Sequence, residues 1–227
     1  MVRDDKWERF LKGGAKICGL TDRPNFRAVL ETGPEAIGLN FWSPGKRFLP
    51  PARAREWRAD FLPEVLRVGV FVNAPTPEIL ALLEDGTIEV AQLHGDEDVA
   101  EIEALQKRGH LVIKAIRPET RSDLQWAESL PADALLVDAA VPGEYGGTGH
   151  RADWAAVGAH LRERGTGLPL LLSGGLRPGT VGEAITQAQP RAVDVASGVE
   201  RSPGWKDPER VAAFLEESRA AFRELGA

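Results

Sequence analysis

A thiol and a carboxyl group stand at the ends of two short apolar runs that lie far apart in the sequence. Cys18, the only cysteine of the chain, closes the run 16–18, and Asp138 directly follows the run 134–137. Runs of this kind are typical of strands buried on both faces. If both strands belong to one parallel barrel, the two groups lie at its C-terminal mouth, where barrel enzymes carry catalytic residues. The pair then predicts general acid and base chemistry, although a lone cysteine is more often a small buried hydrophobe.

Glycines follow two later apolar runs. Gly174 and Gly175 come after the run 169–172, and Ser197 and Gly198 come after the run 192–196. Glycine lets the backbone approach a ligand closely and aim successive N–H groups at one point. In barrels, the loops after strands seven and eight often bind phosphate. The sequence therefore predicts a phosphate cradle here, with two ordinary tight turns as the alternative.

Two further side chains are expected at the same rim. Arg47 lies in the loop after the second apolar run, and it would hold a substrate carboxylate through a bidentate pair or be a solvated loop charge. His94 ends the fourth run, and it would either hydrogen-bond substrate or order neighbouring loops.

The elements that must position these groups alternate along the chain. Strands are predicted at 16–18, 36–41, 67–72, 90–93, 111–115, 134–137, 169–172 and 192–196. Helices are predicted at 22–31, 51–61, 76–84, 96–108, 120–129, 153–164, 180–188 and 208–225, with Thr21 and Asp153 as N-caps of the first and sixth. Eight such units predict an α/β fold, a (β/α)8 TIM barrel with eight parallel strands and outer helices. An open doubly wound sheet is the alternative, and the absence of a dinucleotide fingerprint after the first strand disfavours it.

A single domain is expected over residues 1–227, with 1–14 as a short N-terminal extension. The extension is expected to form a helix that covers the barrel floor through Trp7, Phe10 and Leu11.

Composition excludes several other classes of protein. The chain has 227 residues, 43% of them hydrophobic, and a net charge of −6, which argues against a nucleic-acid surface. One cysteine forms no internal disulfide, and the four histidines show no metal-ligand clustering. No apolar stretch approaches the roughly 20 residues of a membrane span, and no secretion signal is evident, so no membrane association and a cytoplasmic location are expected.

Taken together, a series of short motifs points to one family. The series comprises 16–21, 68–73, 92–95, 136–138, 146–149 with 153–154, 172–176, 193–195, 197–200 and 204–207. In order and spacing these motifs resemble the phosphoribosylanthranilate isomerase family of tryptophan biosynthesis, over nearly the whole chain.

The resemblance implies a role for each site residue. Cys18 matches the family's general base, Asp138 its general acid, and Arg47 the group that holds the anthranilate carboxylate. His94 and Asp194 match active-site rim positions that bind substrate. Gly174, Gly175, Ser197 and Gly198 match the phosphate-binding loops. The chain departs from the family in the arginine loop 43–45, at Ala196 where serine is frequent, and in its longer N-terminal extension.

The implied reaction is an Amadori rearrangement of N-(5-phosphoribosyl)anthranilate, a small phosphosugar substrate, with neither metal nor organic cofactor. Asp138 is expected to be protonated when it acts. The resemblance leaves open whether the protein is a monomer or a homodimer. Two other functions remain as alternatives. One is another phosphosugar barrel, such as a pentose-phosphate epimerase or indole-glycerol-phosphate synthase, and the other is a non-catalytic phosphate-binding barrel.

Overall fold

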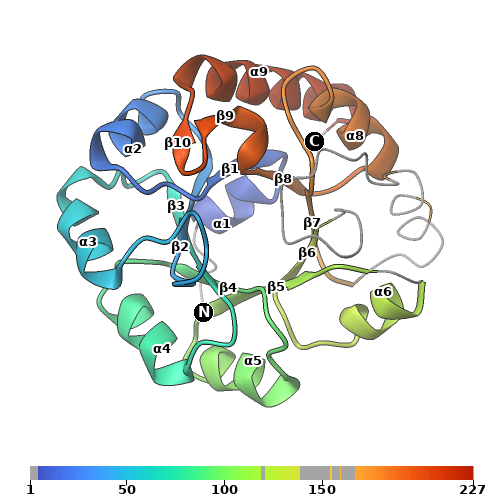
Figure 1. Cartoon of the computed structure of the whole chain (residues 1–227). Helices are drawn as coiled ribbons and strands as arrows, with labels where there is room; N and C mark the ends of the chain where they lie inside the picture. The colour runs from blue at the N-terminus through green and yellow to red at the C-terminus, as the bar shows by residue number, and fades with distance from the viewer. Residues whose placement is uncertain (1–4, 119–120, 139–153, 155–158, 160–166, 227) are drawn as a thin grey trace.

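Eight parallel strands form a closed barrel in the order of the chain, and β8 pairs with β1 (Figure 1). The computed structural model describes residues 5–118, 121–138, 154, 159 and 167–226. The strands are β1 Gly14–Cys18, β2 Ala36–Asn40, β3 Leu66–Phe71, β4 Val90–Leu93, β5 Leu111–Ile116, β6 Ala134–Asp138, β7 Leu170–Ser173 and β8 Ala192–Val195. The predicted (β/α)8 barrel is confirmed, and the closure between β1 and β8 excludes the open doubly wound sheet.

Helices surround the strands on the outside of the barrel (Figure 1). They are α2 Arg23–Leu30, α3 Pro51–Glu56, α4 Thr76–Glu84, α5 Val99–Gln106, α6 Arg121–Glu128, α8 Val181–Ala188 and α9 Pro208–Glu224, and α3 continues into the 3-10 helix η1 Trp57–Asp60. A short 3-10 helix η2 Ser197–Val199 follows β8 and leads into a small hairpin of β9 Glu200–Ser202 and β10 Trp205–Lys206. Most of the predicted helix 153–164, including its cap Asp153, lies outside the described residues.

Helix caps correct the sequence prediction at two places. The N-cap of α2 is Asp22, whose carboxylate accepts a hydrogen bond from the Asn25 N–H at 2.9 Å, so the assignment to Thr21 was wrong. Thr21 instead donates its hydroxyl to the Gly204 carbonyl at 2.9 Å. Helix α5 begins at Val99 and not at 96, because Asp98 and Glu101 form a capping box that fixes its start.

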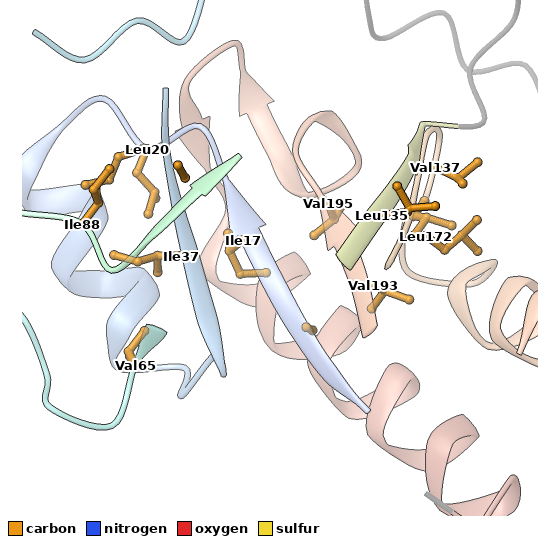
Figure 2. Close-up of a cluster of buried hydrophobic side chains, with 14 of the residues drawn as sticks. Ile17, Leu20, Ile37, Val65, Ile88, Leu135, Val137, Leu172, Val193 and Val195 are labelled. Carbon is orange, nitrogen blue, oxygen red and sulfur yellow. The ribbon is translucent and has the colours of Figure 1, made fainter. Parts of the chain in front are cut away.

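Side chains alternate between two hydrophobic layers along each strand. Outward-facing residues such as Ile17, Val137 and Val193 pack beneath the helices, and Figure 2 shows part of this cluster. Inward-facing residues such as Val68 and Leu136 fill the lower barrel. This period of two is the reason why each strand reads as an almost continuous apolar run.

The N-terminal segment closes the floor of the barrel. Helix α1 Asp5–Phe10 lies inside the ring of helices in Figure 1. Its Trp7 and Phe10 are fully buried, and together with Leu11 they pack against the inward-facing residues of the strands. The prediction that this segment forms a helix over the floor is confirmed.

The inward-facing positions become polar toward the C-terminal ends of the strands. Cys18, Asn40, Asp138 and Ser173 are the last residues of β1, β2, β6 and β7, and Asp194 is the last but one residue of β8. By parity each of these residues lies on the interior face, two positions beyond an inward residue of the same strand. The barrel is therefore apolar at its floor and polar at its mouth.

Candidate active site

Cys18 stands at the mouth of the barrel beside two buried charges. Lys16 precedes it on the same face of β1 and is fully buried, and Asp194 is the β8 residue in register with Lys16. The Lys16 Nζ lies 2.9 Å from Asp194 Oδ1, which makes a buried ion pair. Asp194 continues the polar rim, because its Oδ2 accepts a 3.4 Å hydrogen bond from the Ser173 hydroxyl.

Burial controls the titration of the thiol. Removal from water raises the pKa of Cys18, because the interior disfavours the thiolate. The positive charges of Lys16 and Lys206 act in the opposite direction, and the negative charge of Asp194 adds to the rise. For Lys16, burial acts to lower the pKa, but Asp194 and Cys18 outweigh it and the pKa is raised. Lys16 is therefore an ammonium, and the resting thiol is neutral at neutral pH.

Asp138 lies on the rim at β6, three strands from β1 around the ring through β7 and β8. Its Oδ2 lies 3.3 Å from Arg117 Nε and 3.8 Å from His94 Nε2. Its β7 neighbour in register is Ser173, which in turn contacts Asp194. A continuous set of polar side chains thus runs along the rim from Asp138 to the Lys16–Asp194 pair beside Cys18.

His94 is a neutral imidazole at neutral pH. Burial, with a further contribution from Arg117, lowers its pKa to about 4. The Gln92 side-chain amide nitrogen lies 3.2 Å from His94 Nδ1. Of the two ring nitrogens, Nδ1 thus faces the Gln92 amide, and Nε2 faces Asp138.

A second buried ion pair fixes the loop that carries His94. Lys114 on β5 donates to Glu97 at 2.7 Å and to the Gly95 carbonyl at 2.6 Å. Glu97 also accepts from the N–H groups of Gly95 at 2.9 Å and Asn73 at 2.8 Å. These contacts tie the ends of β3, β4 and β5 together, so the position of His94 is set by three strands.

Arg47 is held in place by the carboxylate of Glu200, a residue that follows β8. Its Nε and Nη2 each donate to Glu200 at 2.7 Å, and its side chain lies against Gly19, where an added Cβ would meet Arg47 Cδ at 2.3 Å. The buried Lys206 donates to Glu200 at 2.7 Å and to the Ala196 carbonyl at 3.0 Å. A guanidinium has five N–H groups, so the edge formed by Nη1 and the remaining Nη2 hydrogen stays available for a second carboxylate.

Charge partners keep Glu200 ionised. Burial acts to raise the pKa of Glu200, but the hydrogen bonds from Arg47 and the charge of Lys206 outweigh it, and the pKa lies below its usual value. The carboxylate therefore holds Arg47 with full charge at neutral pH.

The glycine-rich loops after β7 and β8 lie against each other. Gly174 and Gly175 follow β7 with φ of +91° and +68°, a backbone that favours glycine. Gly198 lies in η2 after β8, where an added Cβ would be only 1.9 Å from the Leu176 carbonyl oxygen. The backbones of the two loops are thus in contact through a residue without a side chain.

The residues expected from the sequence all lie at the C-terminal end of the barrel. Cys18, Asp138, His94 and Asp194 come together around the interior of the mouth, and Arg47 lies against Gly19. Gly174, Gly175, Ser197 and Gly198 lie in the two loops that follow β7 and β8.

Sequence reasoning missed four charged residues of the site, namely Lys16, Arg117, Glu200 and Lys206. A signal existed for two of them. Lys16 is a charge inside an apolar strand, two residues before Cys18 and so on its face, and Arg117 follows the last residue of β5. The partnership of Glu200 with Arg47 had no local signal, because 153 positions separate the two residues.

Within the described part of the chain, no group of three or more His, Cys, Asp or Glu side chains is arranged to hold a metal ion. In the same residues, no helix is long and apolar enough to cross a membrane.

A closed parallel barrel with titratable side chains at its C-terminal mouth defines the class as a (β/α)8 barrel of the enzyme type. The family model described as N-(5'phosphoribosyl)anthranilate (PRA) isomerase matches residues 15–217. The chain belongs to this isomerase family, as its motifs suggested.

Relatives and solved structures agree with this assignment. The N-(5'-phosphoribosyl)anthranilate isomerases of Neisseria meningitidis and Acidithiobacillus ferrooxidans are each 42% identical over 202 residues, which is 88% of this chain and 93% and 94% of the relatives. The crystal structure of phosphoribosyl anthranilate isomerase from Thermotoga maritima superposes with a TM-score of 0.83 at 36% identity, covering 91% of this chain and 98% of that one. A structure of the isomerase in complex with reduced 1-(o-carboxyphenylamino)-1-deoxyribulose 5-phosphate has a TM-score of 0.79 at 33% identity, with the same coverage.

Proposed function

We propose that Cys18 is the general base and Asp138 the general acid with which this isomerase rearranges its substrate. The chain is an isomerase of tryptophan biosynthesis that converts N-(5-phosphoribosyl)anthranilate into 1-(2-carboxyphenylamino)-1-deoxyribulose 5-phosphate. One observation carries the assignment of the two residues. They end two strands of the same closed barrel, and polar side chains connect them around its mouth.

The acid step opens the sugar ring. Asp138 donates a proton to the furanose ring oxygen, the bond between that oxygen and C1 breaks, and the nitrogen lone pair forms an iminium at C1. In the free protein the Asp138 carboxyl group lies beside the Arg117 guanidinium, at 3.3 Å. The His94 Nε2 atom lies 3.8 Å from Asp138 Oδ2, outside hydrogen-bond distance, on the same side of the mouth.

The base step moves the double bond. The iminium acidifies the hydrogen on C2, and the Cys18 thiolate removes it to give an enolamine. Tautomerisation gives the ketone at C2 and the amine at C1, so the reaction is balanced without an external oxidant or reductant. Because burial raises the thiol pKa, the thiolate is the minor form in the free protein. The neighbouring lysines favour that form.

The two ends of the substrate carry negative charge, and each has a matching region at the mouth. The free edge of Arg47 is suited to the anthranilate carboxylate. The backbone of Gly174, Gly175, Ser197 and Gly198 is suited to the 5'-phosphate, because glycines allow N–H groups to converge on an anion. Asp194, paired with Lys16, lies between these regions and is suited to contact the ribose part.

The test follows the fluorescence of the anthranilate substrate, made in situ from anthranilate and phosphoribosyl pyrophosphate, as it decays. Cys18→Ala and Asp138→Asn are each expected to lower kcat by about 10²- to 10⁴-fold, the usual contribution of a general acid or base. Glu103→Gln, which removes an exposed carboxylate that pairs with Lys107 on the outer helix α5, is the matched control and is expected to leave turnover unchanged.

Near-normal turnover in either variant would contradict the role of that residue. Decay that is absent in the unaltered protein, with retained binding of the reduced product analogue, would instead favour a non-catalytic phosphate-binding barrel. The choice between monomer and homodimer and the cytoplasmic location stay predictions.

A further inference from the structure

Lys16 is a buried cation to which the proposed reaction assigns no contact with the substrate. Its side chain has no exposed surface, and it occupies an interior position in a strand that is otherwise apolar. Burying an ammonium in a protein interior is costly unless charge partners compensate. Asp194 supplies one partner, at 2.9 Å.

The ion pair leaves hydrogen-bonding capacity unused. The 2.9 Å contact between Lys16 Nζ and Asp194 Oδ1 is an ion pair whose angles fall outside those of a well-directed hydrogen bond. The ammonium therefore has N–H groups left for another acceptor inside the barrel mouth.

Cys18 is the acceptor within reach. Residues two apart in a strand leave the same face, and their Cα atoms lie about 6.6 Å apart, a distance that a lysine side chain spans. Four charged side chains interact electrostatically with the Cys18 thiol. Lys16 comes from β1, Asp194 from β8, Lys206 from β10 and Arg47 from the loop after β2. Lys16 has the largest effect on the thiol among these charges, second only to burial itself.

We propose that Lys16 is a positioning residue that stabilises the Cys18 thiolate, and that Asp194 limits this effect by neutralising part of the lysine charge. The inference rests on the proposed base role of Cys18 for its catalytic meaning, but the charge relation among the three side chains stands without it. The pair would then serve the chemistry directly above it, and this explains why an otherwise apolar strand contains a lysine.

The experiment measures the ionisation of the thiol itself. Cys18 is the only cysteine, so the ultraviolet absorbance of thiolate reports a single group, and Cys18→Ala supplies the blank for the one tyrosine. Lys16→Met is expected to raise the Cys18 pKa by about one unit or more, the usual effect of a charge at this distance. Asp194→Asn is expected to lower it by a similar amount, because the lysine charge is then no longer neutralised.

Opposite shifts of the Cys18 pKa in the two variants distinguish an effect of charge from a general loss of packing. A loss of packing would shift the pKa in the same direction in both variants. If Lys16→Met alone fails to fold because Asp194 is left unpaired, the comparison is made between Asp194→Asn and the double variant, where removal of the lysine must again raise the pKa. Lys114→Met is the matched control. It removes another fully buried lysine from an ion pair, on the helix-facing side of β5, and is expected to leave the Cys18 pKa unchanged.

The limb of the pH profile of kcat/KM that reports the base is expected to move with the measured thiol pKa in each variant. An unchanged or lowered thiol pKa in Lys16→Met, or an equal rise in Lys114→Met, would overturn the inference. If the thiol shifts as expected while Cys18→Ala still turns over substrate, the base role of Cys18 fails and the charge relation remains.

Discussion

Gly198→Ala probes how closely the two loops after β7 and β8 must approach for phosphate binding. A Cβ at Gly198 would lie 1.9 Å from the Leu176 carbonyl oxygen, and it would lie 2.9 Å from Arg177 Cβ. Real Cβ atoms stay at least 3.0 Å from such atoms, so the backbone of one loop has to move by about 1 Å relative to the other. The obstacle is a backbone carbonyl group, which cannot rotate away as a flexible side chain can.

The size of the effect follows from that displacement. A misplacement of about 1 Å in a substrate-positioning group can cost about 10²-fold in rate. We therefore expect kcat/KM to fall by about 10²-fold, with a rise in KM and weaker competitive inhibition by inorganic phosphate. Forcing an extra methyl group into a packed site also destabilises a protein by about 1–3 kcal/mol. The assay combines fluorescence decay of the substrate with phosphate inhibition and chemical denaturation.

Gly167→Ala is the matched control, because an added Cβ there meets nothing within 4 Å. This variant is expected to keep both activity and phosphate inhibition. If Gly198→Ala were folded and as active as Gly167→Ala, with unchanged phosphate inhibition, the loops would not form the cradle and the reasoning would be refuted.

Three further predictions concern charge, pH and the barrel floor. Glu200→Gln is expected to raise KM more than it lowers kcat, because Arg47 loses its charged bidentate partner. Steady-state kinetics would separate the effects on KM and kcat. An unchanged KM would argue against the proposal that Arg47 binds the substrate carboxylate. His94 has a folded-state pKa of about 4 against 6.5 for the unfolded chain, so as pH falls through this window the unfolded state takes up a proton that the folded state refuses. The free energy of unfolding should therefore decrease on acidification by up to about 3 kcal/mol, and His94→Asn should flatten this dependence in urea titrations at several pH values. Trp7→Ala is expected to lower the free energy of unfolding by about 3–5 kcal/mol, because it leaves a cavity at the barrel floor. A decrease no larger than that caused by Trp126→Ala, at an exposed position, would show that α1 is not part of the core.

Much of the fold was predictable because its signals are local. Buried parallel strands read as short apolar runs whatever their partners, and each of the eight barrel strands lies within two residues of its expected bounds. The small hairpin of β9 and β10 was not predicted. The errors occurred at helix starts, where one side chain decides the cap. Asp22 and not Thr21 caps α2, and the Asp98 capping box delays the start of α5 to Val99. Neighbouring polar residues look equivalent in sequence, and only the backbone angles determine which of them accepts the N–H.

The sequence by itself determined the barrel, the helix on its floor and the identity of the chemical groups, since periodicity and residue type depend on neighbours along the chain. Only the tertiary structure decided the charge pairs that set how those groups behave. Lys16 with Asp194 and Arg47 with Glu200 join positions 178 and 153 residues apart, and closure of β8 onto β1 brings both pairs to one side of the mouth. Electrostatic interactions depend on distance in space and on exclusion of water, and neither quantity is encoded in the spacing of residues along the chain.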